Sequence, residues 1–237
     1  MLGGKIMLNN VLEEEARKRK LLEEVFSEDM INWSKGILRE YNKLMAYYRC
    51  AIMEVETKFN VLNEEFSLRH DRNPINGIKS RLKRLDSIKE KLERKDLSFD
   101  LQAIQENIHD VAGVRVICSF VDDVYLLADA LLKQDDITLI EKKDYIADPK
   151  PNGYRSLHLI VAVPIFLEHE KRVMQVEIQL RTIAMDFWAS LEHQLRYKKD
   201  FDFTNDMAKE LQDCAELSAQ LDGRMDLLRE RVETQNT

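Results

Sequence analysis

The pattern of apolar and polar positions predicts both strands and helices along the chain. Between 173 and 181, apolar residues alternate strictly with polar ones, which is typical of a strand with one buried face. Its apolar positions are Met174, Val176, Ile178 and Leu180, and its polar positions are Gln175, Glu177, Gln179 and Arg181. Three further segments also predict strands, namely 113–120, 138–142 and 156–163.

Helices are expected on both sides of these strands. Residues 9–65 contain few helix breakers and many Leu, Glu, Lys and Arg, and Ser27 precedes two acids, as a helix N-cap does. The segment 71–76 predicts a turn at Pro74, followed by a helix to about Lys95. Further helices are expected at 121–133, 183–197 and 205–233. We therefore expect an α+β fold in which helices surround a mixed β-sheet of about four to five strands.

Composition narrows the class of protein. The 237 residues are 44% hydrophobic and 33% charged, as in a globular protein rich in helix. We find no apolar run long enough for a membrane span and no signal peptide, so a cytoplasmic protein without membrane contact is expected. The three cysteines lie far apart and predict neither a disulfide framework nor a zinc site. The net charge of -7 argues against a general nucleic-acid coat protein.

One basic segment stands out against this acidic background. Between residues 79 and 95 there are eight basic residues and three acids, which predicts a focused anion site. On a helix, Arg81 would fall inside an apolar arc, where a guanidinium needs a partner or a flat surface such as a purine base. That arc consists of Ile78, Leu82, Leu85, Ile88 and Leu92. Lys83, Lys91 and Arg94 would cluster on the opposite side, a pattern that a solvated helix face also explains.

Two carboxylates, an imidazole and an aromatic ring are further candidates for chemistry. Magnesium is usually held by one or two carboxylates plus substrate phosphates, which Asp110 and Glu177 would provide if their strands are neighbours. A simple strand-entry cap is equally open for Asp110. His158 lies on a mostly apolar strand, where an imidazole needs a partner. Tyr154 follows Gly153 in a predicted turn, from which its ring can reach a ligand.

Seven motifs, in chain order, resemble the RelA/SpoT-type alarmone synthetase domain. They are Asn73–Ile75, Lys79–Lys83, Asp110–Arg115, Asp144–Ile146, Gly153–His158, Glu177–Thr182 and Phe187–His193. The resemblance extends from about Trp33 to Leu228 and is to the small alarmone synthetases, in particular their RelP-like branch. It implies a nucleotidyltransferase-like fold with an N-terminal helical extension (1–27), a synthetase domain (28–200) and a C-terminal helical region (201–237).

The resemblance implies a reaction and a donor site. Proteins of this family transfer pyrophosphate from ATP to the 3'-hydroxyl of GDP or GTP, which releases AMP and requires Mg2+. Carried over to this sequence, Arg81 and Arg115 would hold adenine. The cations implied to bind the ATP phosphates are Lys83, Lys91 and Arg94. Asp110 and Glu177 would hold the metal, and Glu177 would also act as the base.

The acceptor site is implied in the same way. Tyr154 would stack on guanine, and Asp186 would accept hydrogen bonds from the guanine edge, although some family members have asparagine there. Lys143, Lys150 and His158 would steer the acceptor's phosphates or the transferred group. The resemblance also implies a homotetramer. The stretch 54–65 is acidic and poorly suited to an anion, so we expect no activation by the product.

Two other classes of function remain open from the residues alone. An HD-type phosphohydrolase is suggested by His70-Asp71 and His109-Asp110, but it would need further histidine ligands. A non-catalytic RNA-binding or helical adaptor protein is suggested by the basic segment and the long helices. Against the second alternative, no aromatic residue is interleaved with the cations between 79 and 95.

Overall fold

The computed structural model describes residues 28–70, 72–196 and 203–235. It divides the chain into two compact units, 1–46 and 47–237. Helix α2 (Glu28–His70) begins in the first unit and ends in the second, which contains the other elements of the described residues. The helix expected before residue 28 lies outside the described residues, and the domain boundaries expected at 27 and 200 stay predictions.

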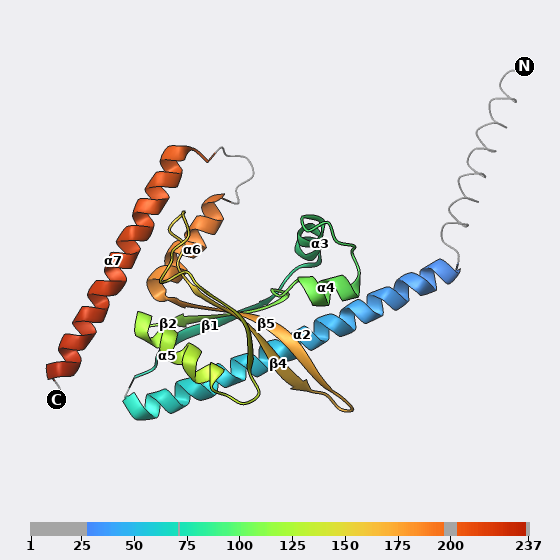
Figure 1. The fold of residues 1–237 in the computed structure, drawn as a ribbon, viewed down its shortest axis with the longest axis horizontal. Coiled ribbons are helices and arrows are strands. Elements are labelled where there is room, and N and C mark those ends of the chain that lie inside the picture. The colour runs from blue at the N-terminus through green and yellow to red at the C-terminus, as the bar shows by residue number, and fades with distance from the viewer. Residues whose placement is uncertain (1–27, 71, 197–202, 236–237) are drawn as a thin grey trace, which may run out of the picture. The chain divides into compact units, whose positions relative to one another are not determined.

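Five strands form one mixed sheet in the order β1-β2-β5-β4-β3 (Figure 1). The strands are β1 (Ile75–Leu82), β2 (Ala112–Cys118), β3 (Thr138–Asp144), β4 (Leu157–Phe166) and β5 (Lys171–Thr182). Strands β2 and β5 run parallel, and the other neighbouring pairs run antiparallel. The structure therefore confirms the α+β fold, and it contains all four strands that the hydropathy pattern predicted.

Strand β1 corrects one expectation, since the segment up to Lys95 was predicted to be a single helix. It forms β1 followed by the short helix α3 (Leu85–Glu93). Arg81 therefore lies on an edge strand, paired with Gly113 of β2, and not within an apolar helical arc. The apolar spacing belonged to two different elements. Hydrogen bonds to β2, which are long-range, decide the conformation here against the local helical periodicity.

The remaining helices are α4 (Leu101–Asn107), α5 (Val121–Leu132), α6 (Ile183–Arg196) and α7 (Asn205–Gln235). The sequence did not predict α4, which is capped by Asp100 accepting a hydrogen bond of 2.8 Å from the backbone of Ala103. Helices α5, α6 and α7 confirm the other three predictions within a few residues.

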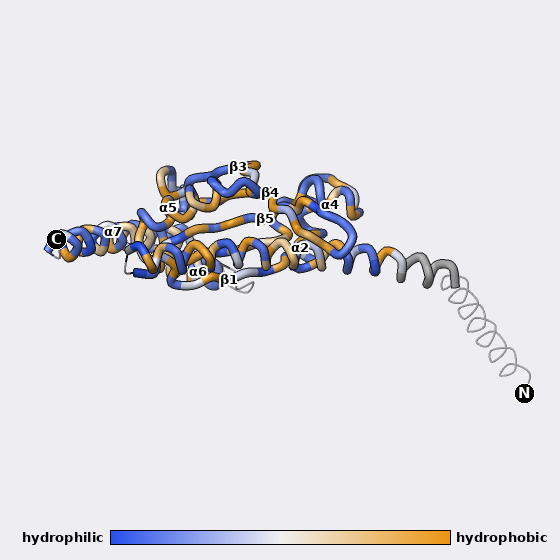
Figure 2. The backbone as a smooth tube through the Cα atoms, turned by 90° about the horizontal axis from the view of Figure 1, so that it is seen from below, coloured by the Kyte–Doolittle hydropathy of each residue, from blue (hydrophilic) through white to orange (hydrophobic). Residues whose placement is uncertain are grey.

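The core lies on one face of the sheet. On β5, the side chains of Val176, Ile178 and Leu180 are fully buried, as the alternation predicted. Helices α5 and α6 pack against β2 and β5. In the part of α2 that belongs to the second unit, Lys58 pairs with Asp136 beyond α5 at 2.6 Å. Figure 2 shows the resulting mixture of hydrophobic and hydrophilic positions along each element.

Helix α7 packs along α6 and against the loop between β3 and β4 (Figure 1). The indole of Trp188 donates a hydrogen bond of 2.8 Å to the carbonyl of Leu211. Gly153 has a φ of +87°, and a Cβ built there would lie 2.4 Å from the Cβ of Ala215. The hydroxyl of Thr182 donates to Asp222 at 2.7 Å. The two hydrogen bonds hold α7 in place, and Gly153 brings the loop that contains Tyr154 close to it.

Candidate active site

The polar face of the sheet carries two rows of residues that cross all five strands. From β1 to β3, the first row is Arg81, Gly113, Glu177, Ile160 and Glu141. The second row is Lys79, Arg115, Gln179, His158 and Lys143. Candidates from five separate segments of the sequence are thus brought together by strand register. Because β5 is the central strand, Glu177 lies in the middle.

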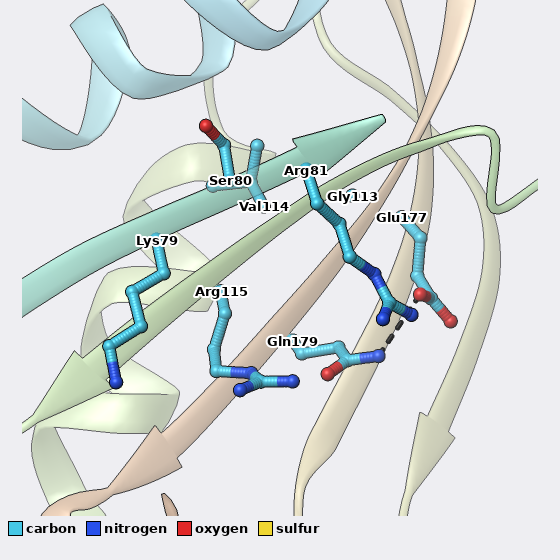
Figure 3. Close-up of a pocket in the computed structure, with 8 residues that line it drawn as sticks. All are labelled: Lys79, Ser80, Arg81, Gly113, Val114, Arg115, Glu177 and Gln179. Atoms are coloured by element: carbon cyan, nitrogen blue, oxygen red, sulfur yellow. Dashed lines mark hydrogen bonds between the residues drawn. The ribbon is translucent and has the colours of Figure 1, made fainter. Parts of the chain in front are cut away.

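The first of two pockets beside Glu177, called here the β1–β2 pocket, has a volume of about 160 Å3. It is lined by Lys79, Ser80, Arg81, Gly113, Val114, Arg115, Glu177 and Gln179. Figure 3 shows Arg81, Arg115 and Gln179 projecting on the same side as Glu177. The Nε of Arg115 is buried and has no hydrogen-bond partner among the described residues. The pocket thus offers two guanidinium groups, one with a donor still to be satisfied.

The second pocket, called the β3–β4 pocket, has a volume of about 200 Å3. It is lined by Glu141, Lys143, Tyr145, Lys150, His158, Ile160 and Glu177. The hydrogen bond from Lys143 to Glu141 raises the pKa of Lys143, so this ammonium group stays charged at neutral pH. Glu177 lines both pockets. A group bound in either pocket therefore comes close to the same carboxylate.

Aromatic rings surround one end of the β3–β4 pocket. The ammonium of Lys150 lies 4.5 Å from the ring centre of Tyr145 and 4.8 Å from that of Tyr154. The rings of Tyr145 and His158 meet edge to face at 5.2 Å. On Tyr154, the guanidinium of Arg181 lies 5.0 Å from the ring centre. The pocket therefore combines a cation with flat apolar surfaces, which suits a base and its phosphates.

Glu177 is held by two polar neighbours. Its Oε1 lies 3.5 Å from Nδ1 of His158, and its Oε2 accepts a hydrogen bond of 3.0 Å from Gln179 (Figure 3). Burial opposes ionisation of Glu177. The hydrogen bonds from His158 and Gln179 outweigh burial and lower the pKa of the carboxyl group below its ordinary value. The side chain is therefore a carboxylate at neutral pH.

Asp110 lies in the loop before β2, between two lysines. Lys83, directly after β1, and Lys91 on α3 each place Nζ 2.8 Å from a different carboxylate oxygen of Asp110. A backbone hydrogen bond of 2.8 Å from Lys83 to Val111 fixes this end of β1. Burial disfavours the charge on Asp110, but the two lysines more than offset it, so its pKa is lowered. Lys83 and Lys91 were expected to cluster with Arg94 on one face of a single helix, but they meet at Asp110 from different segments.

Arg94 does not join Lys83 and Lys91 at Asp110, and Asp186 does not lie with the other residues expected to bind the acceptor nucleotide. Arg94 is exposed, and its Nε donates to the carbonyl of Glu90 at 3.3 Å. Asp186, at the start of α6, is buried and forms an ion pair with Arg115 at 3.2 Å. It also contacts Lys79 at 3.0 Å and Arg181 at 3.4 Å. Two residues expected to contact different nucleotides, Arg115 and Asp186, are therefore paired with each other.

Three residues of the site were given no role by sequence reasoning. Gln179 and Arg181 share the polar face of β5 with Glu177, and Tyr145 lies beside Lys143 in the β3–β4 pocket. The alternation placed Gln179 and Arg181 on the correct face, but their partners come from other strands. Arg181 is 3% exposed, although arginines on the polar face of a strand are mostly exposed, so the alternation could not predict its burial.

The carboxylates fit a magnesium ion by their chemistry. Asp110 and Glu177 are ionised oxygen donors, and the charge of Asp110 acts on the titration of Glu177. Magnesium needs only one or two such ligands when phosphates supply others. Among the described residues, there is no group of three or more His, Cys, Asp and Glu side chains arranged to hold a metal.

Comparison with known proteins places this chain in a family. Residues 80–202 match the family model described as "Region found in RelA / SpoT proteins", which covers more than half of the chain. The chain therefore belongs to the RelA/SpoT family, as its motifs indicated. It is 43% identical to the GTP pyrophosphokinase YwaC of Bacillus subtilis over 81% of this chain and 91% of that protein. It is 35% identical to the GTP pyrophosphokinase YjbM of the same organism, over 82% and 91%.

Solved structures agree with these relatives. Small alarmone synthetase 2 from Bacillus subtilis matches with a TM-score of 0.74 at 41% identity, covering 81% of this chain and 99% of that chain. Small alarmone synthetase 1 from the same organism, bound to its product pppGpp, matches with a TM-score of 0.75 at 34% identity, over 82% and 98%. None of the helices in the described residues has the length and apolar character needed to cross a membrane.

Proposed function

We infer that this protein is a GTP pyrophosphokinase that makes (p)ppGpp, transferring pyrophosphate from ATP to the 3'-hydroxyl of GDP or GTP and releasing AMP. Membership of the RelA/SpoT family and 43% identity to a GTP pyrophosphokinase support this activity. One observation carries the inference in the structure itself. Glu177 lies on the central strand, where it lines both the β1–β2 pocket and the β3–β4 pocket.

The β1–β2 pocket suits the donor nucleotide. Arg81 on β1 and Arg115 on β2 both line this pocket. Arg81 pairs with Gly113, two residues before Arg115 on the neighbouring strand. Guanidinium planes stack well on a purine base. Beyond the pocket, Lys83 and Lys91 supply two cations for the ATP phosphates. Arg94 is exposed and could join these phosphates only by leaving the carbonyl of Glu90. We keep its phosphate role as a proposal on this basis.

The β3–β4 pocket suits the acceptor nucleotide. Tyr154 presents a ring for guanine, and Lys143 and Lys150 present ammonium groups for its phosphates. His158 lies between Tyr154 and Glu177, close to where the 3'-hydroxyl must meet the transferred group. Asp186 is buried among three cations, so its proposed contact with guanine requires at least one of them to give way.

The reaction places definite demands on Glu177. The 3'-oxygen forms a bond to the β-phosphorus of ATP, the bond from that phosphorus to the α-phosphate oxygen breaks, and AMP leaves. The proton of the 3'-hydroxyl passes to a carboxylate oxygen of Glu177. A carboxylate with a lowered pKa is a weak base, so the hydroxyl must be positioned and polarised for this transfer. Positioning and charge neutralisation dominate in phosphoryl-type transfer.

Mg2+ is the cofactor that we propose, held by Asp110 and Glu177 together with the phosphates of ATP. When bound, it would neutralise phosphate charge and polarise the reacting oxygens. Asp110 is at present neutralised by Lys83 and Lys91. These lysines contribute in a second way, because they keep the Asp110 carboxylate ionised and ready to bind a cation.

The first test is direct. The purified protein is incubated with ATP, Mg2+ and either GDP or GTP, and the nucleotides are separated by anion exchange. We expect AMP together with a guanosine tetra- or pentaphosphate, and we expect Glu177→Ala to abolish turnover while ATP binding persists. If neither acceptor gives a product from a folded sample, the proposed activity is wrong and the RNA-binding alternative gains weight. Unfolding of Glu177→Ala would argue against the catalytic role of this residue.

We also propose that copies of this chain assemble, as a homotetramer by resemblance. Large apolar side chains are exposed along α7, at Leu217, Leu221, Met225, Leu228 and Val232. Most of them recur at helical spacings of three, four or seven, so they share a stripe away from the buried Leu211 and Ala215. Light scattering after size exclusion would measure the assembly, and Leu221→Glu should reduce its mass. A monomer in the wild-type protein would refute the proposal.

A further inference from the structure

Arg181 is the origin of two hydrogen-bonded arms that end on Glu177. Arg181 is 3% exposed and lies near the end of β5, four residues after Glu177 and on the same face of the strand. Its Nη2 donates to the hydroxyl of Tyr154 and also to Oε1 of Gln179, the latter at 2.9 Å. One nitrogen of a buried cation thus contacts two side chains that both lead to the carboxylate.

The first arm passes through the β3–β4 pocket. The hydroxyl of Tyr154 lies 2.8 Å from Nε2 of His158, and Nδ1 of the same imidazole lies 3.5 Å from Oε1 of Glu177. The second arm stays on β5. Nε2 of Gln179 donates to Oε2 of Glu177 at 3.0 Å (Figure 3). Each arm therefore reaches a different oxygen of the same carboxylate.

Donor counting fixes the direction of every bond in these arms for a neutral His158. Arginine can only donate, so the oxygens of Tyr154 and Gln179 accept from it. If His158 is neutral and donates from Nδ1 to Glu177, its Nε2 is an acceptor, and the hydroxyl of Tyr154 is the donor in their 2.8 Å hydrogen bond. In a neutral imidazole the proton must lie on Nδ1, where it faces Glu177, which as a carboxylate can only accept. The amide of Gln179 is oriented in the same way, with its oxygen toward Arg181 and its nitrogen toward Glu177.

We propose that Arg181 is a positioning residue, which through Tyr154 and Gln179 fixes both oxygens of Glu177 and keeps His158 in the tautomer with the proton on Nδ1. This inference rests on the proposed function, in which Glu177 receives the proton of the acceptor hydroxyl. It gives Tyr154 a second role, because its hydroxyl orients the catalytic carboxylate while its ring binds the base. The specific acceptor site and the base are coupled by one side chain.

Kinetics of four single variants and one double variant test the proposal in the pyrophosphate-transfer assay. Tyr154→Phe keeps the ring and removes the first arm, and Gln179→Met keeps the volume and removes the second. Each should lower kcat about tenfold, as expected for loss of a hydrogen bond to a charged group, with the KM for the acceptor changed less than about threefold. Arg181→Met removes the donor from which both arms start, and should lower kcat no further than the Tyr154→Phe/Gln179→Met double variant does. Arg181→Lys should recover part of the lost kcat, because it restores a donor.

Arg172→Met is the matched control. Arg172 also lies on β5, but it packs on Tyr47 and pairs with Glu170 at 3.1 Å, away from both pockets. Its kcat should equal that of the wild type. An unchanged kcat in Tyr154→Phe, or a loss that appears only in the acceptor KM, would overturn the proposal. If Arg181→Met does not fold, the Tyr154→Phe and Gln179→Met variants still decide.

The tautomer of His158 gives a readout that does not depend on activity. The protein contains five histidines, so 15N-labelled histidine gives few ring signals, and His158→Gln identifies the one that matters. We expect the proton on Nδ1 in the wild type and its appearance on Nε2 in Tyr154→Phe. A wild-type ring with the proton on Nε2, or on both nitrogens, would refute the arrangement. If the wild-type protein shows the expected tautomer but forms no product in the pyrophosphate-transfer assay, the proposed function alone would be refuted.

Discussion

Replacement of Gly153 by alanine should disturb both stability and acceptor binding. Gly153 has a φ of +87°, a region that an L-residue enters at a cost of about 1–2 kcal/mol. A Cβ at this position would also lie 2.4 Å from the Cβ of Ala215, and neither atom can rotate away. Overpacking of this kind costs about 1–3 kcal/mol. Together the two effects predict a loss of about 2–5 kcal/mol in the free energy of unfolding.

The clash and the backbone strain can be separated with a second substitution. Ala215→Gly removes the methyl group that Gly153→Ala would meet, and alone it costs about 1 kcal/mol because glycine is unfavourable within a helix. In the double variant the backbone strain persists but the clash disappears. The double variant should therefore be more stable than the sum of the two single effects predicts, by about 1–3 kcal/mol.

Urea denaturation at constant pH measures these free energies, and steady-state kinetics follow the function. Because Tyr154 is adjacent to Gly153, the displaced loop should raise the KM for GDP or GTP and leave the KM for ATP near its wild-type value. Ala215→Gly should restore part of the acceptor KM in the double variant. Additivity of the two free-energy changes to within about 0.5 kcal/mol would show that the side chains do not meet, and would refute the reasoning.

Three other predictions follow from the site and its surroundings. Arg115→Met should raise the KM for ATP about tenfold, the effect of one lost charged contact, whereas a rise in the acceptor KM alone would show that Arg115 acts through Asp186. Burial raises the pKa of Asp222, so the folded protein binds this proton more tightly than the unfolded chain, and stability is lost as pH rises from the ordinary aspartate value through the raised one. Asp222→Asn should accordingly have a higher Tm than the wild type at pH 7, and the difference should vanish near about pH 3; equal Tm values at both pH values would contradict this. Addition of pppGpp should not increase the initial rate, given the acidic stretch at 54–65, and a rise in rate would refute that expectation.

The error over 77–95 shows what the periodicity of a single segment can miss. Helix α3 was part of the prediction, and its buried Ile88 and Leu92 agree with helical spacing. Arg81 precedes it on an edge strand whose hydrogen bonds are made with β2, more than thirty residues later in the chain. Edge strands often alternate weakly, because only one side pairs and much of their surface meets solvent. Residue spacing could not reveal that partner.

The candidate site divides in a similar way. The motif order identified the family, and the alternation of β5 correctly placed Glu177, Gln179 and Arg181 on one face. The pairing of Arg115 with Asp186 could not be foreseen, since the two come from different elements and were expected at different nucleotides. The same holds for Arg181, whose burial depends on Tyr154 from the loop before β4. Interactions between side chains of distant segments are set by packing that the local pattern does not contain.

The sequence by itself determined which segments are strands or helices over most of the described chain, which face of β5 is buried, and which residue types are available for chemistry. These features depend on local periodicity and on residue identity. The tertiary structure alone decided that Arg81, Gly113 and Glu177 lie side by side and that Glu177 borders two pockets. Strand order and register fix such contacts, because they depend on hydrogen bonds and packing between segments far apart in the chain.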